Sequence, residues 1–96
     1  MTVKLKKWDI QDHLKTQEDR QTYLEAALEE ASDDPVYIAH VLGDIAKSYG
    51  MTKLAQETGL TREGLYKSFG KQGNPSFVTV SKVANALGLK LSFQPV

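Results

Sequence analysis

The chain has 96 residues, 41% of them hydrophobic, and its twelve Lys and Arg balance its twelve Asp and Glu. This length predicts one domain with a modest core. Because there is no Cys and there are only two His, disulfides are excluded, and neither a metal nor a cofactor is expected. The N-terminus lacks the apolar run of a signal peptide, and no segment approaches the ~20 apolar residues of a membrane span. We therefore expect a cytoplasmic protein without membrane association.

The zero net charge hides two halves of opposite sign. Residues 1–50 carry six basic and ten acidic side chains, a net charge of −4, whereas residues 51–96 carry six basic and two acidic ones, a net charge of +4. Such a basic half is suited to phosphate, and the acidic half is not. The zero net charge is therefore no argument against nucleic-acid binding.

The first half predicts a short helical turn near Asp9 and then two amphipathic helices. Thr16 has the position of an N-cap before an acidic first turn, and Asp34 caps the second helix, with Pro35 in its first position. Apolar residues recur at helical spacing in both segments. They are Leu24, Ala27, Leu28 and Ala31 in the first, and Ile38, Val41, Leu42, Ile45 and Tyr49 in the second. Gly50 ends the second helix.

Residues 51–69 predict two short helices around a glycine turn, which is the order of a helix-turn-helix for duplex DNA. Leu54 lets the first helix pack on the second, and Gly59 supplies the positive φ that ends the first. Thr61 caps the second helix. Gly64 lies inside that helix and costs on the order of 1 kcal/mol relative to Ala. We therefore expect the second helix to form fully only when it is packed or bound.

The C-terminal part predicts one more helix and a strand. Ser76 caps the helix, Gly88 closes it, and its buried stripe is Phe77, Val80, Val83, Ala84 and Leu87. Residues 89–94 then alternate apolar and polar, as a half-buried strand does. Their partner is either residues 2–6 or the same strand of a second subunit. In the second case Leu89, Leu91 and Phe93 form the contact of a homodimer, which suits two recognition helices ~34 Å apart on DNA.

Two motifs carry a resemblance to known families. The run from Leu54 through Gly59 to Leu65 resembles the helix-turn-helix of lambda-repressor-like regulators. The segment Gly-Asn-Pro-x-Phe-x-Thr-Val at 73–80, followed by Ala-Leu-Gly-Leu at 86–89, is similar to the addiction-module antidotes, HigA-like antitoxins encoded beside RelE/HigB-type toxins. The N-terminal pattern fits as well, so the resemblance covers nearly the whole chain.

We therefore expect an all-α fold, a lambda-repressor-like helix-turn-helix bundle with N-terminal helices and a short C-terminal β-strand. The expected parts are an acidic helical extension (1–34), a helix-turn-helix domain (35–88) and a dimerisation strand (89–96). The resemblance implies an antitoxin that neutralises an mRNA-cleaving, RelE/HigB-like toxin. It also implies that the protein binds operator DNA and represses its own operon.

The candidate DNA contacts follow once the inward-facing Leu65 and Phe69 are set aside. They are Thr52, Gln56, Thr61, Arg62, Glu63, Tyr66, Lys67 and Lys71. Arg62 and Lys67 suit guanine edges or phosphates, and Tyr66 suits a thymine methyl group or a phosphate. The alternative is that Arg62 and Lys67 only solubilise the helix, with Glu63 and Lys67 as a local pair.

The candidate toxin contacts lie in the acidic extension, because a toxin that handles RNA should be basic. They are Trp8, Glu25, Glu29 and Glu30. The alternative is that these glutamates form a solvated helix face and that Trp8 packs the N-terminus onto the body. No nucleophile is placed beside His40 and Asp44, so an enzyme is not expected. Two other hypotheses remain, a repressor of prophage type without a toxin and a fold used only for protein contacts.

Overall fold

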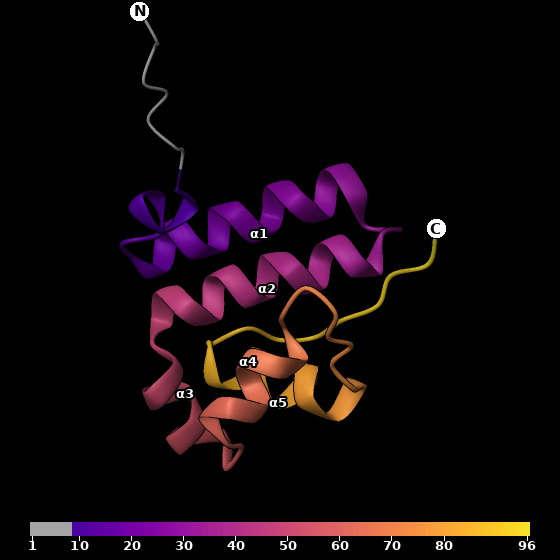
Figure 1. Cartoon of the computed structure of the whole chain (residues 1–96). Coiled ribbons are helices and arrows are strands. Elements are labelled where there is room, and N and C mark those ends of the chain that lie inside the picture. The colour runs from indigo at the N-terminus through magenta and orange to yellow at the C-terminus, as the bar shows by residue number, and fades with distance from the viewer. Residues whose placement is uncertain (1–8) are drawn as a thin grey trace, which may run out of the picture.

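The computed structural model describes residues 9–96, which fold into one short 3-10 helix and five α-helices. These elements are η1 (Ile10–His13), α1 (Gln17–Ala31), α2 (Pro35–Tyr49), α3 (Met51–Thr58), α4 (Arg62–Ser68) and α5 (Phe77–Ala86). The two long helices α1 and α2 run antiparallel, and the three shorter helices gather along the other side of α2 (Figure 1). No helix within residues 9–96 is both long enough and apolar enough to cross a membrane.

The predicted N-caps are confirmed, which explains where the helices begin. Thr16 forms a capping box, because its hydroxyl accepts from the Asp19 N–H at 3.0 Å while the Asp19 carboxylate accepts from the Thr16 N–H at 3.2 Å. The hydrogen bond from the Lys15 backbone N–H contributes most to lowering the pKa of Asp19. Asp34 and Ser76 cap α2 and α5 by accepting from the Tyr37 and Thr79 backbone N–H groups.

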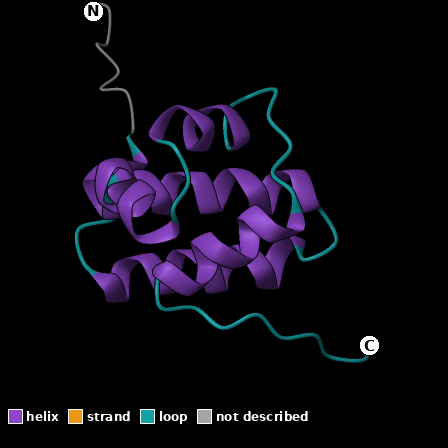
Figure 2. Ribbon diagram, turned by 90° about the horizontal axis from the view of Figure 1, so that it is seen from below, coloured by secondary structure: helices purple, strands orange, loops and turns teal. Residues whose placement is uncertain are grey.

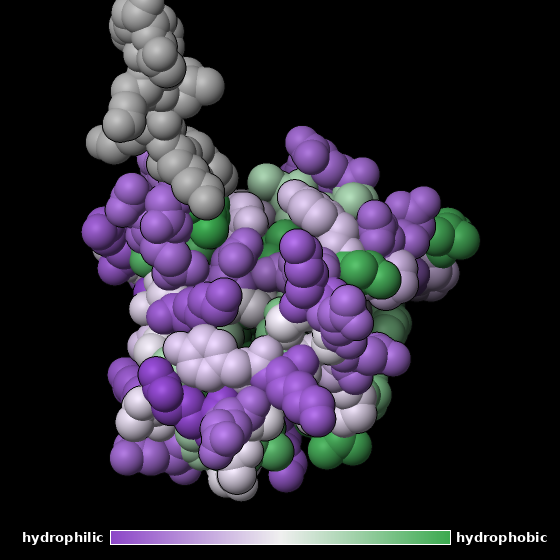
Figure 3. Space-filling view, in the orientation of Figure 1, coloured by the Kyte–Doolittle hydropathy of each residue, from purple (hydrophilic) through white to green (hydrophobic). Residues whose placement is uncertain are grey.

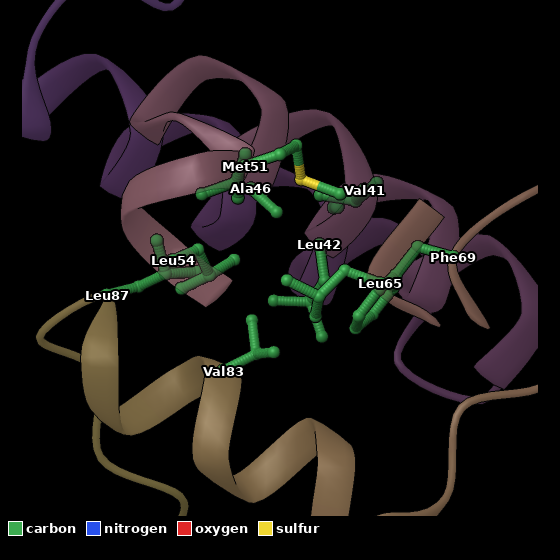
Figure 4. Packing of buried hydrophobic residues seen from close by; sticks show 11 residues of the cluster. Val41, Leu42, Ala46, Met51, Leu54, Leu65, Phe69, Val83 and Leu87 are labelled. Atoms are coloured by element: carbon green, nitrogen blue, oxygen red, sulfur yellow. The ribbon is translucent and has the colours of Figure 1, made fainter. Parts of the chain in front are cut away.

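The core lies where α2, α3, α4 and α5 converge. Its most deeply buried large side chains are Val41, Ile45, Leu54, Leu65 and Val83, each under 2% exposed. Figure 4 shows Leu54, Leu65 and Val83 pointing into the same space from three different helices. The short helices α3 and α4 contribute the buried Leu54 and Leu65 to this core. Tertiary packing therefore stabilises two helices that are too short to be stable alone.

Polar contacts fasten α1 to α2. The Tyr23 hydroxyl donates to the Asp44 carboxylate at 2.9 Å, and the Arg20 guanidinium donates to the Ser48 hydroxyl at 3.1 Å. Burial and the bond to Asp44 raise the pKa of Tyr23 well above its usual range. These bonds join residues more than twenty positions apart, so they fix the acidic helix α1 against the body of the molecule.

The predicted C-terminal β-strand is wrong, although the all-α class is confirmed for residues 9–96. Leu89 donates its N–H to the Ala84 carbonyl at 2.8 Å and packs against the core, and residues 90–96 then run exposed along the outside of the helices. Figure 2 shows this tail as a loop with no strand beside it. Alternation of side chains is not sufficient, because a strand needs a neighbouring backbone to pair with. The proposed partner segment 2–6 lies outside the described residues.

Candidate nucleic-acid interface

The turn between α3 and α4 has the geometry that its sequence predicts. Gly59 adopts the left-handed conformation at φ 76° and donates its N–H to the Ala55 carbonyl at 3.0 Å. Thr61 then accepts from the Gly64 N–H at 2.9 Å and caps α4. Leu65 and Phe69 hold this helix to the core at 1% and 8% exposure. Its other side is therefore presented to solvent in a fixed orientation.

All eight candidate DNA contacts are exposed in the structure. They are Thr52 and Gln56 on α3, Thr61, Arg62, Glu63, Tyr66 and Lys67 at the cap and on α4, and Lys71 in the following loop. The surface over α3 and α4 is largely hydrophilic (Figure 3). Their exposure is compatible with groove contacts and equally with solubilising charges, so the assignment to DNA stays a prediction.

A contact within α4 orders Arg62, one of its two exposed cations. The Arg62 guanidinium carbon lies 5.1 Å from the centre of the Tyr66 ring, a cation–π arrangement across one helical turn. The ring holds the guanidinium near the start of α4 while its N–H groups remain able to donate. An ordered donor loses less conformational entropy on binding than a mobile one.

Sequence reasoning missed a second cluster, which is centred on Tyr49. The Lys53 ammonium and the Arg20 guanidinium lie 4.5 and 5.8 Å from the centre of its ring. Its hydroxyl donates to the Glu57 carboxylate, which raises the pKa of Tyr49. The spacing of 49, 53 and 57 at four-residue intervals was the signal available for part of it, although Gly50 interrupts the helix between them. Arg20 could not have been placed, because it comes from α1.

Gly64 is part of α4 and lies beside the residue that caps this helix. A Cβ at this position would lie 2.7 Å from the Thr61 hydroxyl oxygen, the atom that caps the helix. A side chain at this position would therefore crowd the capping hydroxyl. The helix α4 is continuous across Gly64 and is packed on the core through Leu65.

We expect Gly64→Ala not to stabilise the protein and, at most, to destabilise it slightly. This is the opposite of the ~1 kcal/mol gain that the higher helix propensity of Ala alone would give. The added methyl group displaces a cap that is typically worth ~1 kcal/mol. In a Thr61→Gly background, which has no capping hydroxyl, the same substitution should stabilise the protein. Urea unfolding of the four variants measures this coupling. Equal effects of Gly64→Ala in both backgrounds would contradict the steric explanation.

Glu25, Glu29 and Glu30 are all exposed on α1, as expected of candidate toxin contacts. They do not share one face, because at about 100° per residue Glu25 and Glu29 lie about 40° apart on the helix whereas Glu30 lies on the side of Tyr23. Trp8, the fourth candidate, lies outside the described residues. Within residues 9–96 no group of three or more His, Asp or Glu could hold a metal ion.

The described part of the molecule is a small helical protein with exposed Arg62 and Lys67 on the short helix α4 and with an acidic helix α1. A family model described as "probable addiction module antidote protein" matches residues 4–95, and the chain belongs to this family. It is 44% identical over 94 residues to a Haemophilus influenzae protein described as an uncharacterized protein, covering 98% of this chain and 95% of that one. No solved structure matches it significantly.

Proposed function

We propose that this antidote neutralises a RelE/HigB-like, mRNA-cleaving toxin by binding it, and that it represses its own operon by binding operator DNA through α4. The observation that carries the proposal is the match of nearly the whole chain to an antidote family. An antidote has a toxin as its partner. A stand-alone repressor of prophage type has less support, because a repressor without a toxin partner would not account for membership of an antidote family.

The exposed side of α4 supports the DNA half of the proposal. A short helix fixed to the core by Leu65, with Arg62 and Lys67 on its outer side, has the chemistry of a recognition helix. The hypothesis of a fold used only for protein contacts relied on a helix weakened by Gly64. Because α4 is continuous across Gly64 and capped by Thr61, this hypothesis has less support. A gel shift with the region upstream of the gene separates the two hypotheses.

A homodimer remains part of the proposal, although the C-terminal segment that would form it is a loop and not a strand. Leu91 and Phe93 are 42% and 84% exposed, so they are accessible to a second copy, whereas Leu89 is half-buried against its own core. Two copies on a two-fold operator would place their α4 helices ~34 Å apart. Sedimentation equilibrium at tens of micromolar tests this, and a monomer mass throughout would count against it.

The acidic helix α1 is the proposed toxin surface, and charge reversal tests it. We expect the triple variant Glu25→Lys, Glu29→Lys, Glu30→Lys to bind the protein encoded by the adjacent gene about tenfold more weakly, mainly through slower association. Biolayer interferometry at two salt concentrations measures this. The affinity of the Glu→Gln triple variant should lie between those of wild type and the Glu→Lys triple variant. A complex that is indifferent to the reversals would remove these glutamates from the interface.

A further inference from the structure

An apolar groove of about 500 Å³ opens on the surface between the end of α1, the start of α2, the loop 70–75 and the start of α5. Buried Leu42 and Phe69 are among the side chains that line it. Three large hydrophobic side chains of the lining remain unusually exposed: Leu28 at 42%, Val36 at 65% and Phe77 at 63%. The prediction that Phe77 belongs to the buried stripe of α5 is therefore wrong. Exposed apolar side chains gathered around one hollow mark an interaction site more often than scattered ones do.

The loop that forms one wall of the groove is held closely against α4. A Cβ at Gly73 would collide with the carbonyl oxygens of Lys67 and Ser68, so only a glycine fits this approach. The Gly73 N–H also donates to the Gly70 carbonyl at 2.9 Å. The wall is therefore a fixed part of the fold, as a preformed binding site requires.

Acidic side chains border the groove along α1 and the α1–α2 turn. Residues 21–46 contain neither Lys nor Arg. Glu25 and Glu29 lie on one side of Leu28 on the helix, about 60° and 100° from it, and Asp33 and Asp34 lie between the lining residues Ser32 and Pro35. The opposite wall carries Lys71. The charge on the α1 side is therefore complementary to a basic partner.

We propose that this groove receives an apolar side chain of the toxin, presented by a basic segment whose Lys or Arg meet the acidic border. The inference rests on the proposed function and assigns the anchor point of that interface. An apolar anchor in a pocket with charges at its rim is the usual arrangement of a protein–protein hot spot. The outward side chains of α4 do not line the groove, so the proposed toxin and DNA surfaces are distinct, and they meet at the loop with Lys71.

Two valines provide a matched test. Val36 and Val78 are each the second residue of a helix and are 65% and 61% exposed, but only Val36 lines the groove. Val36→Lys should weaken binding to the purified protein encoded by the adjacent gene about tenfold or more, as expected for loss of an anchor. Val78→Lys adds the same charge and should change the affinity less than about twofold. Calorimetric titration and thermal unfolding of each variant measure affinity and folding.

The outcomes separate this inference from the proposed function. If wild type binds and both valine variants bind alike, the groove is not the anchor point. If wild type itself fails to bind, the proposed function falls, and the inference falls with it. A dimer of the isolated chain that Val36→Lys converts to monomer would assign the groove to a second copy and overturn the inference.

A crosslinking measurement keeps the test decisive should Val36→Lys fold poorly. With p-benzoylphenylalanine in place of Phe77, ultraviolet light should join the chain to the toxin in a one-to-one adduct visible by mass spectrometry. Formation of the noncovalent complex without any adduct would overturn the proposal.

Discussion

Leu65→Ala should lower the free energy of unfolding by about 2–5 kcal/mol. The side chain is 1% exposed and is the main attachment of a seven-residue helix to the core. A domain of this size has about 5–15 kcal/mol of stability in total, so the loss is a large fraction of it. Because α4 cannot persist without packing, DNA binding should disappear at a lower temperature than in wild type.

Equilibrium urea unfolding followed by circular dichroism measures this effect. Lys82→Ala provides the control, because Lys82 is exposed on α5 and its removal should change stability by less than about 0.5 kcal/mol. A loss below about 1 kcal/mol for Leu65→Ala would mean that α4 is not fixed to the core through this residue.

Arg62→Ala should weaken binding to DNA from upstream of the gene by about 1–3 kcal/mol and relax the sequence preference if the guanidinium contacts a base. Lys67→Ala, if it removes a phosphate contact, should weaken binding to all duplexes alike and reduce the salt slope by about 1. Fluorescence anisotropy with the upstream duplex and a scrambled one, at several salt concentrations, distinguishes these effects.

Lys15→Ala is the matched control for this experiment. It removes one positive charge from an exposed position outside α3 and α4, and the Lys15 backbone bond to Asp19 is kept. Equal losses of DNA affinity for Lys15→Ala and Arg62→Ala would indicate that the overall charge of the molecule attracts DNA, and not Arg62 and Lys67 on α4.

Much of the fold could be predicted from local signals. Caps and turns depend on neighbouring residues, so Thr16, Asp34, Thr61 and Ser76 begin helices where the sequence predicts them, and Gly59 ends α3. The prediction of a C-terminal strand was wrong because a strand depends on a neighbouring backbone, which the alternation of residues 89–94 does not supply. Gly64 was interpreted through its helix propensity alone, whereas the structure places it beside the capping hydroxyl of Thr61.

The candidate sites also differ in whether neighbouring or distant residues form them. The outward residues of α4 follow from helical periodicity and the buried Leu65, and all of them are exposed. The apolar groove could not be predicted, since its walls come from α1, α2, α5 and the loop 70–75, far apart in the chain. The contact between Arg20 and Tyr49 was missed for the same reason.

The most direct test of the DNA-binding proposal is an NMR titration of the ¹⁵N-labelled chain with the duplex from upstream of its gene. We predict specific, saturable shift changes at the amides of residues 52–71, strongest at the start of α4, with α1 unaffected. Shift changes confined to α1, or none at low salt, would contradict recognition of DNA through α4.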